Sequence, residues 1–428
     1  MNPLRTGVLL LTLAIVPRPG AESRAMRAAA TTPYVNGSDT AADVGELLRA
    51  VRGASPLVCG MAARALSSGF GGSGWDAPAP PTGAEVRERL ASLSDRTLAP
   101  ADVDTLLAAL DESDPCAREI GARMLGRAGT DAPVDALLAR LASTSSSTRA
   151  AAVLSLGLAR PRQAIEPLIR VLSDNADAVR ANAAWALGRV RDTQAVAPLT
   201  RALRDAQPIV RGAAVVALGR IRSTDPVDAL MKVLREDPSA DVRRAAAWAL
   251  GQLEDDTAID ALAAALQHDD SASVREMSAW ALGQFHDAAA SALSALATAV
   301  QSDRSTDVRS SAAWSIGQIR PERAPSGLVQ ALHDADDDVR ENVAWALGQI
   351  RDTTSLPALE KAMQQEHVAD VRRVEFRALL LTGEHSERAL TEALKSSDAE
   401  IREMAVMALA GRGMRPWPMP RPRPRPFP

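Results

Sequence analysis

Tryptophan recurs at one position of a repeated segment, and a polar side chain follows it each time. The stretch "ANAAWALGRV" (181–190) returns as "RAAAWALGQL", "EMSAWALGQF", "SSAAWSIGQI" and "ENVAWALGQI". Trp and Arg are favoured anchors at protein interfaces, so this chemistry indicates recognition rather than catalysis. The tryptophans, which we call the tryptophan row, are Trp185, Trp248, Trp280, Trp314 and Trp345. The polar residues four positions later are Arg189, Gln252, Gln284, Gln318 and Gln349, with Arg220 in a copy that has Val216 in place of tryptophan.

Each segment has the apolar spacing of a helix, and its tryptophan falls outside the apolar stripe. Val179, Ala183, Leu187 and Val190 cluster within about 80° of arc, and Trp185 lies about 160° from their centre. Because the stripe must face a partner helix, we expect the tryptophan row to point outward. Five exposed rings would exceed the apolar area that a soluble surface tolerates. Two interpretations therefore stay open: a groove for an apolar or proline-rich segment of another protein, or tight curvature in which neighbouring tryptophans bury one another.

Residues that perform catalysis or bind metals do not form recognisable motifs in this sequence. It contains no HExxH, no glycine-rich phosphate loop and no CxxC pair. Its five histidines fall mostly at predicted turns and do not share one position of the repeat. We therefore predict no catalytic residue, no metal site and no cofactor, and we predict that the protein is not an enzyme.

Composition limits both the fold class and the kind of partner. The 428 residues are 46% hydrophobic but only 3% aromatic, so Ala and Leu must supply most of the packing. This composition favours helix over sheet. A net charge of −4 at pH 7 provides no general attraction for nucleic acid, and we predict no nucleic-acid partner.

The chain is built from repeats that align on one arginine, usually within a "VR" pair. Successive reference arginines are 30 to 34 residues apart, and such a period is typical of a solenoid. One repeat predicts a first helix at Gln194 to Arg204 and a second at Ile209 to Ile221, separated by a turn. The reference arginines are Arg118, Arg149, Arg180, Arg211, Arg243, Arg275, Arg309, Arg340, Arg372 and Arg402.

The motif "VRxxAAxALGxI" resembles the short HEAT repeats of the phycobilisome-lyase type, and the resemblance covers residues 101–411. It implies an all-α fold, a right-handed α-solenoid of about ten HEAT-like helical hairpins with a degenerate N-terminal cap. In such solenoids the second helices line the concave surface. The resemblance therefore implies that the tryptophan row lies on that surface.

HEAT repeats carry an aspartate in the turn and a basic residue in the second helix, and this chain has both. The resemblance implies a structural ladder of these Asp and Arg side chains along the stack. Glu112, Ser143, Glu366 and Ser396 replace the aspartate in outer repeats, so we expect the ladder to be incomplete at both ends. The ladder residues are Asp174 and Arg180, Asp205 and Arg211, Asp237 and Arg243, Asp269 and Arg275, Asp303 and Arg309, and Asp334 and Arg340.

The two ends of the chain differ in composition from the repeats. Residues 1–25 have the charged start, apolar run and small residues of a signal peptide, which predicts export to the periplasm or cell envelope of a bacterium. Residues 26–100 form a predicted helical cap with a Gly/Pro-rich break. Residues 412–428 are a Pro/Arg-rich tail, either solvated or able to make weak contact with an anionic envelope surface.

Two cysteines, Cys59 and Cys116, lie roughly two repeats apart in this alignment. Helices in a stack are about 8–10 Å apart, whereas a disulfide needs Cα atoms within about 7 Å. We therefore expect two buried free thiols, unless the N-terminal region folds back onto the first repeats.

These features predict a non-catalytic scaffold or adaptor that binds another protein or peptide in its concave groove. Two alternatives stay open. One is an enzyme or accessory factor of the bilin-lyase kind, which the family resemblance implies. The other is a structural spacer whose cationic tail makes the only contact.

Overall fold

The computed structural model describes residues 44–55, 59, 98–128, 133–383 and 387–410. These residues belong to one unit that begins at Val44. The predicted signal peptide, most of the predicted cap and the predicted tail lie outside the described residues. The division into these segments therefore stays a prediction.

Every regular element in the described ranges is a helix, and from α5 onward the helices come in pairs. The first helices of the pairs are α5 (Pro100–Leu110), α7 (Val134–Arg140), α9 (Ile165–Val171), α11 (Val196–Ala202), α13 (Val227–Glu236), α15 (Ile259–His268), α17 (Leu293–Ser302), α19 (Ser326–Gln330), α21 (Leu356–Gln365) and α23 (Glu387–Leu394). The second helices are α6 (Pro115–Arg127), α8 (Ser146–Ala159), α10 (Asp177–Val190), α12 (Pro208–Ile221), α14 (Ala240–Leu253), α16 (Ala272–Gln284), α18 (Thr306–Ile319), α20 (Asp337–Ile350), α22 (Ala369–Thr382) and α24 (Ala399–Leu409). The predicted all-α solenoid of helical hairpins is confirmed.

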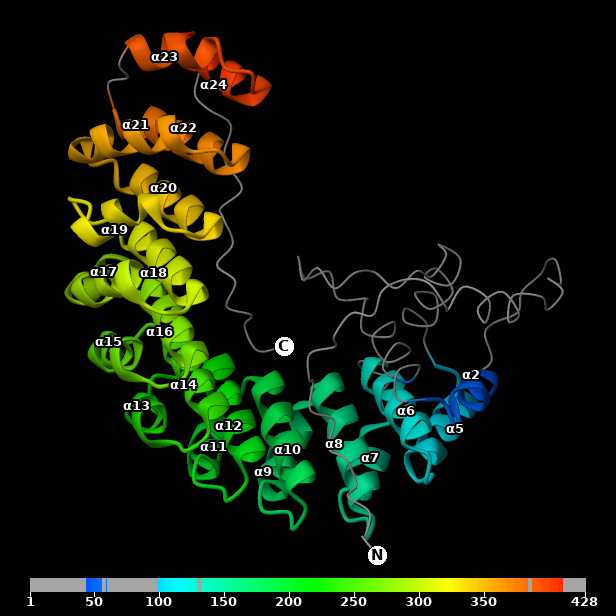
Figure 1. Ribbon diagram of the computed structural model, residues 1–428. Coiled ribbons are helices and arrows are strands. Elements are labelled where there is room, and N and C mark those ends of the chain that lie inside the picture. Colours follow the sequence, from blue (N-terminus) through cyan, green and yellow to red (C-terminus); the bar gives the residue numbers. More distant parts are fainter. Residues whose placement is uncertain (1–43, 56–58, 60–97, 129–132, 384–386, 411–428) are drawn as a thin grey trace, which may run out of the picture. The chain divides into compact units, whose positions relative to one another are not determined.

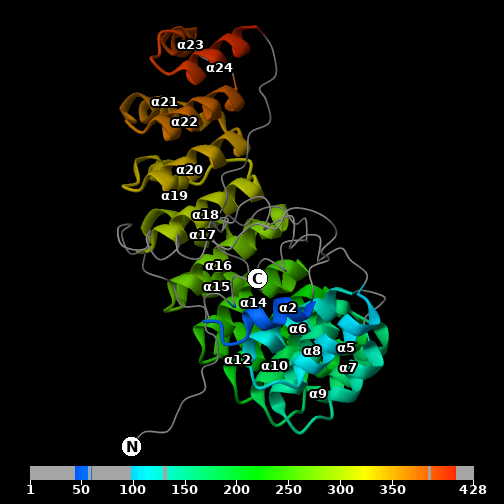
Figure 2. The same cartoon turned by 90° about the vertical axis from the view of Figure 1, so that its right-hand side faces the viewer.

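Second helices pack against each other in sequence order, and each also packs against the first helix of its own pair. Figures 1 and 2 show the two rows that result, one of first helices and one of second helices. The core between the rows consists mainly of Ala, Leu and Val side chains. The predicted apolar stripe of α10 lies in it, because Val179, Ala183 and Leu187 have no exposed surface.

Local sequence explains where the second helices begin. Acidic residues occupy the first turn of several of them, for example Asp177 of α10 and Asp241 of α14. There they complement the positive end of the helix dipole. Proline stands in the first turn of α12, where its missing N–H costs no helical bond.

The turns that follow seven second helices contain a residue with positive φ, between 49° and 60°. Glycine usually occupies this position, because a Cβ atom is strained in the left-handed region. Here none of the seven is glycine, and arginine stands at five of them. They are Arg160, Arg191, Arg222, Glu254, His286, Arg320 and Arg351.

Each ladder arginine joins two successive repeats. The Arg180 guanidinium donates to Asp205 of the next turn through Nε (2.7 Å) and Nη2 (2.9 Å), and to the carbonyl of Asp174 in its own turn through Nη1 (2.8 Å). Asp205 also accepts a bond from the Gln207 N–H at 2.9 Å. The Arg180 guanidinium lowers the pKa of the Asp205 carboxyl, which keeps the carboxylate charged.

The same pairing continues along the stack, always from an arginine to the acid of the following repeat. Glu366 extends the ladder at its C-terminal side because its longer side chain still reaches Arg340, at 2.6 Å. One step further, Arg373 rather than the reference arginine Arg372 pairs with Asp398. The pairs are Arg149–Asp174, Arg180–Asp205, Arg211–Asp237, Arg243–Asp269, Arg275–Asp303, Arg309–Asp334 and Arg340–Glu366.

The prediction of two free thiols is wrong, because Cys59 and Cys116 form a disulfide with a Cα–Cα distance of 5.6 Å. Helix α2 (Val44–Val51) packs on α5 and α6 and brings the chain after it to the start of α6. Arg52 pairs with Glu112 at 2.7 Å in the same region. Spacing in the repeat alignment could not reveal this contact, since α2 lies outside the regular repeats.

Candidate binding surface on the second helices

One face of the second helices carries the predicted recognition residues. We call it the second-helix face and define it by positions +1, +5 and +9 counted from each reference arginine. The tryptophan row occupies +5, and the predicted Arg and Gln side chains occupy +9. The ladder holds these positions in register from one repeat to the next.

The expectation that the whole tryptophan row points outward is wrong. Trp248, Trp314 and Trp345 are buried, with only 7%, 6% and 4% of their surface exposed. Trp185 and Trp280 are partly exposed. The interpretation in which the rings pack between repeats therefore describes most of the row.

Glycine at position +8 of the preceding repeat explains this burial. A Cβ atom placed on Gly219 would lie 2.8 Å from Cζ3 of Trp248 and 3.0 Å from Cα of Ala249. A Cβ atom on Gly283 or Gly317 would meet the rings of Trp314 and Trp345 in the same way, and Gly157 also receives the ring of Trp185, which stays partly exposed. The "WALG" motif is thus a packing unit: the glycine lets two second helices approach, and the next tryptophan covers the glycine.

The accessible part of the second-helix face is polar. All six predicted +9 side chains are partly exposed: Arg189, Arg220, Gln252, Gln284, Gln318 and Gln349. The Arg189 guanidinium lies 5.5 Å from the centre of the Trp185 ring, within range of a cation–π contact. Arg320 donates to the Gln349 side chain at 3.3 Å. The face therefore offers hydrogen-bonding groups at a fixed interval, beside the accessible edges of two tryptophans.

Acidic side chains stand at position +1 in four repeats, and two of them, Glu276 and Glu341, lie in helices of the tryptophan row. Burial, together with the negative charge of Asp307, raises the pKa of Glu276 to about 7. Burial likewise raises the pKa of Glu341, aided by Asp338 and other nearby carboxylates. These groups lie at the N-terminal ends of their helices, whereas the +9 side chains lie at the C-terminal ends.

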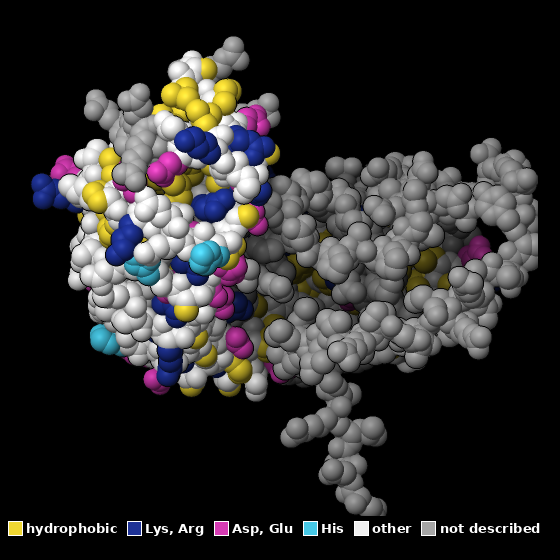
Figure 3. Space-filling view, turned by 45° about the horizontal axis from the view of Figure 1, so that its top comes forward, with side chains coloured by type: hydrophobic (Ala, Val, Ile, Leu, Met, Phe, Trp, Pro, Cys, Tyr) yellow, Lys and Arg dark blue, Asp and Glu magenta, His cyan; other side chains and the backbone are white. Residues whose placement is uncertain are grey.

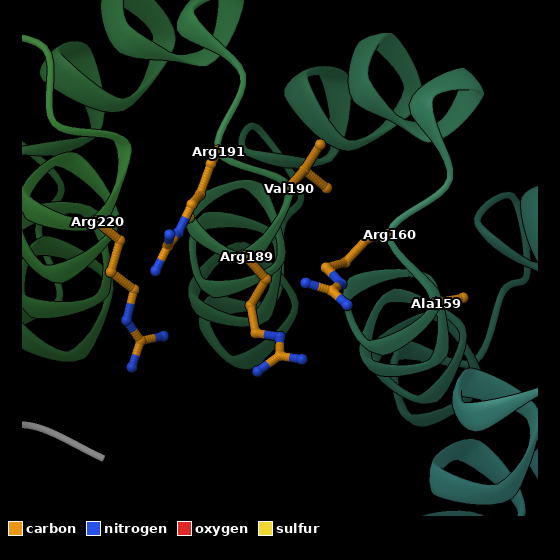
Figure 4. Close-up of a pocket in the computed structure, with 7 residues that line it drawn as sticks. Ala159, Arg160, Arg189, Val190, Arg191 and Arg220 are labelled. Atoms are coloured by element: carbon orange, nitrogen blue, oxygen red, sulfur yellow. The ribbon is translucent and has the colours of Figure 1, made fainter. Parts of the chain in front are cut away.

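A cavity of about 650 Å³ lies at the C-terminal ends of α8, α10 and α12, lined by four arginines. Arg189 and Arg220 are predicted site residues, whereas Arg160 and Arg191 were not identified from the sequence. Figure 4 shows Arg189 between Arg160 on one side and Arg191 and Arg220 on the other. In three successive repeats an arginine stands eleven positions after the reference arginine. This spacing could have identified Arg160 and Arg191 from the sequence.

Other chemistry is not evident in the part of the chain that the structure describes. No group of three or more His, Cys, Asp or Glu side chains there could hold a metal ion. No described helix is long and apolar enough to cross a membrane. Figure 3 shows one face of the molecule, on which basic and acidic side chains are interspersed.

Comparison with known proteins identifies the repeat type. The family model for HEAT repeats matches residues 103–178, 134–219, 165–238, 227–316 and 293–380, which together span more than half of the chain. No curated protein matches significantly.

Similar solved structures include an engineered protein (21% identity, TM-score 0.44, covering 72% of this chain and 98% of that one). The Escherichia coli protein YibA is 20% identical, with a TM-score of 0.43 and coverage of 66% and 98%. The complex of CpcE and CpcF of phycocyanin lyase from Nostoc is 24% identical, with a TM-score of 0.36 and coverage of 58% and 93%. With its repeated helical pairs, its ladder and the family match, the chain belongs to the HEAT-repeat family.

Proposed function

We propose that this protein is a non-catalytic scaffold that binds another protein or peptide along its second-helix face. The proposal assigns no catalytic residue and no cofactor. The observation that carries it is the constant register of the partly exposed +9 side chains across six successive second helices.

The hydrogen bonds of the ladder stabilise the stacking of repeats that keeps the +9 side chains in register. Bidentate Arg–carboxylate bonds are strong and directional, and each ladder arginine adds a third bond to a backbone carbonyl. Side chains in the Arg211–Asp237 pair are only 11% and 5% exposed, so solvent screens them little. A face held this firmly loses little conformational entropy when it binds a partner.

The partly exposed tryptophans supply apolar contact area to the same face. Trp185 and Trp280 are partly exposed, while Cζ3 of each ring lies against a glycine of the preceding repeat. The guanidinium of Arg189 over Trp185 adds a hydrogen-bonding group at the same place. Aromatic and arginine side chains in such a setting are frequent hot spots of protein interfaces.

Site-specific photo-cross-linking tests the proposal. A photo-reactive residue would replace Gln284 on the second-helix face or, as the matched control, the exposed Gln267 on α15 of the same pair. We expect one partner to be cross-linked from position 284 and not from position 267. Equal cross-linking from both positions, or none from position 284, would contradict the proposed face.

A further inference from the structure

The arginine cluster at the ends of α8, α10 and α12 lies outside the ladder. Arg160 and Arg191 follow the ends of α8 and α10, while Arg189 and Arg220 belong to the last turns of α10 and α12. All four line one cavity of about 650 Å³ (Figure 4). The residues that line it include no acidic side chain.

The cluster concentrates positive charge where part of each side chain is removed from water. Burial lowers the pKa of the Arg189 guanidinium, and the charges of Arg160, Arg220 and Arg191 lower it further. Burial and the charge of Arg191 also lower the pKa of Arg220. Three helix C-termini contribute about half a negative charge each, which offsets less than half of the four positive charges.

Backbone conformation adds a second cost at the same place. Arg160 and Arg191 have φ values of 56° and 59°, a left-handed conformation that strains a residue with a Cβ atom but not glycine. Later repeats also place a residue other than glycine at this strained turn (Glu254, His286, Arg320 and Arg351), but there its +9 neighbour is glutamine. Among the described repeats, arginine occupies both position +9 and the strained turn at α10 and α12. Strained backbone of this kind is often found at functional sites.

We propose that this cluster binds an acidic segment of the protein partner in an extended conformation. Neighbouring second helices are about 8–10 Å apart, and an extended chain rises about 3.3 Å per residue. Carboxylates at every third residue would therefore meet arginines of successive repeats. The proposal deepens the proposed function and rests on it, because the cluster lies at the edge of the second-helix face.

Geometry within this chain shows how the contact would form. Its ladder arginines grip carboxylates through paired bonds of 2.7–2.9 Å, as in Arg149 with Asp174. The exposed Arg160 and Arg191 side chains in the cavity would use the same fork against carboxylates of the partner. The chain's own C-terminal segment is not the occupant we propose, because "RPWPMPRPRPRPFP" contains arginines and no acidic residue.

Fluorescence anisotropy with a labelled peptide of repeated Glu-Ser-Ser tests the proposal. The probe is compared with a Gln-Ser-Ser peptide of the same length, at low and at moderate salt. The protein variant is R160Q/R191Q/R220Q, and the matched control is R351Q, which changes the same strained turn position in a later repeat. Circular dichroism first verifies that all three proteins have the same helix content.

We expect the full-length protein to bind the acidic peptide at least about tenfold more tightly than the Gln peptide, with affinity falling as salt rises. The triple variant should lose about tenfold in affinity, and the control variant less than about twofold. Equal binding of both peptides, equal loss in both variants, or preference for a DNA duplex over the acidic peptide would overturn the proposal. If the peptide does not bind while cross-linking from position 284 persists, this inference fails and the proposed function stands.

Discussion

At the scale of single residues, glycine and tryptophan act as one packing unit across the boundary between repeats. Gly219 has no Cβ, and the ring of Trp248 and the backbone of Ala249 occupy the space that a Cβ would need. The same arrangement joins Gly317 to Trp345 and Gly283 to Trp314. The tryptophan row is therefore first a device that holds second helices together.

Gly219→Ala is expected to destabilise the protein by about 1–3 kcal/mol, because the new methyl group would press on the backbone of α14. Gly212→Ala in the same helix is the matched control, since its nearest neighbour would be a Val242 methyl group at an ordinary 3.8 Å. This control should be neutral or stabilising by up to about 1 kcal/mol, because alanine favours helix. Thermal unfolding followed by circular dichroism measures both, and equal effects would contradict the packing unit.

A carboxyl group in the core creates a pH-dependent weak point. Glu375 of α22 has no exposed surface, and neither of its carboxyl oxygens has a hydrogen-bond partner among the described residues. Burial raises its pKa from the ordinary 4.5 to about 8, with a further contribution from the charge of Glu366. Most other repeats have a small residue at this position, such as Ala183 or Ala312.

The folded state holds the proton of the Glu375 carboxyl more tightly than the unfolded state does. The contribution of Glu375 to stability should therefore be greatest below pH 4.5. It should fall as the pH rises from 4.5 to about 8, and then level off. Glu375→Gln should remove this part of the pH dependence, which urea denaturation at several pH values would measure. An unchanged slope between pH 5 and 8 in the variant would show that Glu375 is charged in the folded protein.

At the scale of helices, the ladder fixes how one pair sits on the next. The Arg275–Asp303 pair ties the turn before α16 to the turn before α18, and its side chains are only 6% and 9% exposed. Arg275 also donates to the carbonyl of Asp269. The ladder arginines therefore do two things: they pair with a carboxylate, and they donate hydrogen bonds to turn carbonyls that have no partner within a helix.

Asp303→Ala is expected to cost about 3–5 kcal/mol, because it leaves the buried guanidinium of Arg275 without its carboxylate. The matched control is Glu236→Ala, which removes the partner of Lys232 in a surface pair whose side chains are 69% and 58% exposed. That change should cost less than about 1 kcal/mol. Urea unfolding compares the two, and similar midpoints would mean that the ladder adds no stability.

Sequence patterns predicted the helices, and the family resemblance implied the Asp–Arg ladder, but neither predicted how the tryptophans pack between second helices. The second helix expected at Ile209 to Ile221 is observed at Pro208–Ile221, because its apolar spacing and its proline mark the same limits. The spacing of apolar residues in a second helix indicates only the face that meets the first helix of the same pair, so it does not predict the burial of the tryptophans. Their burial depends on the close approach of the neighbouring second helix, which is a property of the stack rather than of one helix.

At the scale of the whole molecule, each described repeat contacts mainly its neighbours, as expected for a solenoid. Stability and recognition can then be assigned to different side chains of one helix. In α18, the buried Trp314 contributes to packing, whereas the partly exposed Gln318 one turn later contributes to the polar row at +9. This division is the central claim of our account.

The most direct test compares Trp314→Ala with the combined replacement of Gln284, Gln318 and Gln349 by alanine. Each protein is measured for thermal unfolding and for binding to the partner captured from position 284. We predict that Trp314→Ala lowers stability by about 3–5 kcal/mol. We predict that the glutamine variant stays within about 1 kcal/mol of the original and weakens partner binding about tenfold. The account would be contradicted if Trp314→Ala kept its stability but lost partner binding, while the glutamine variant bound the partner normally.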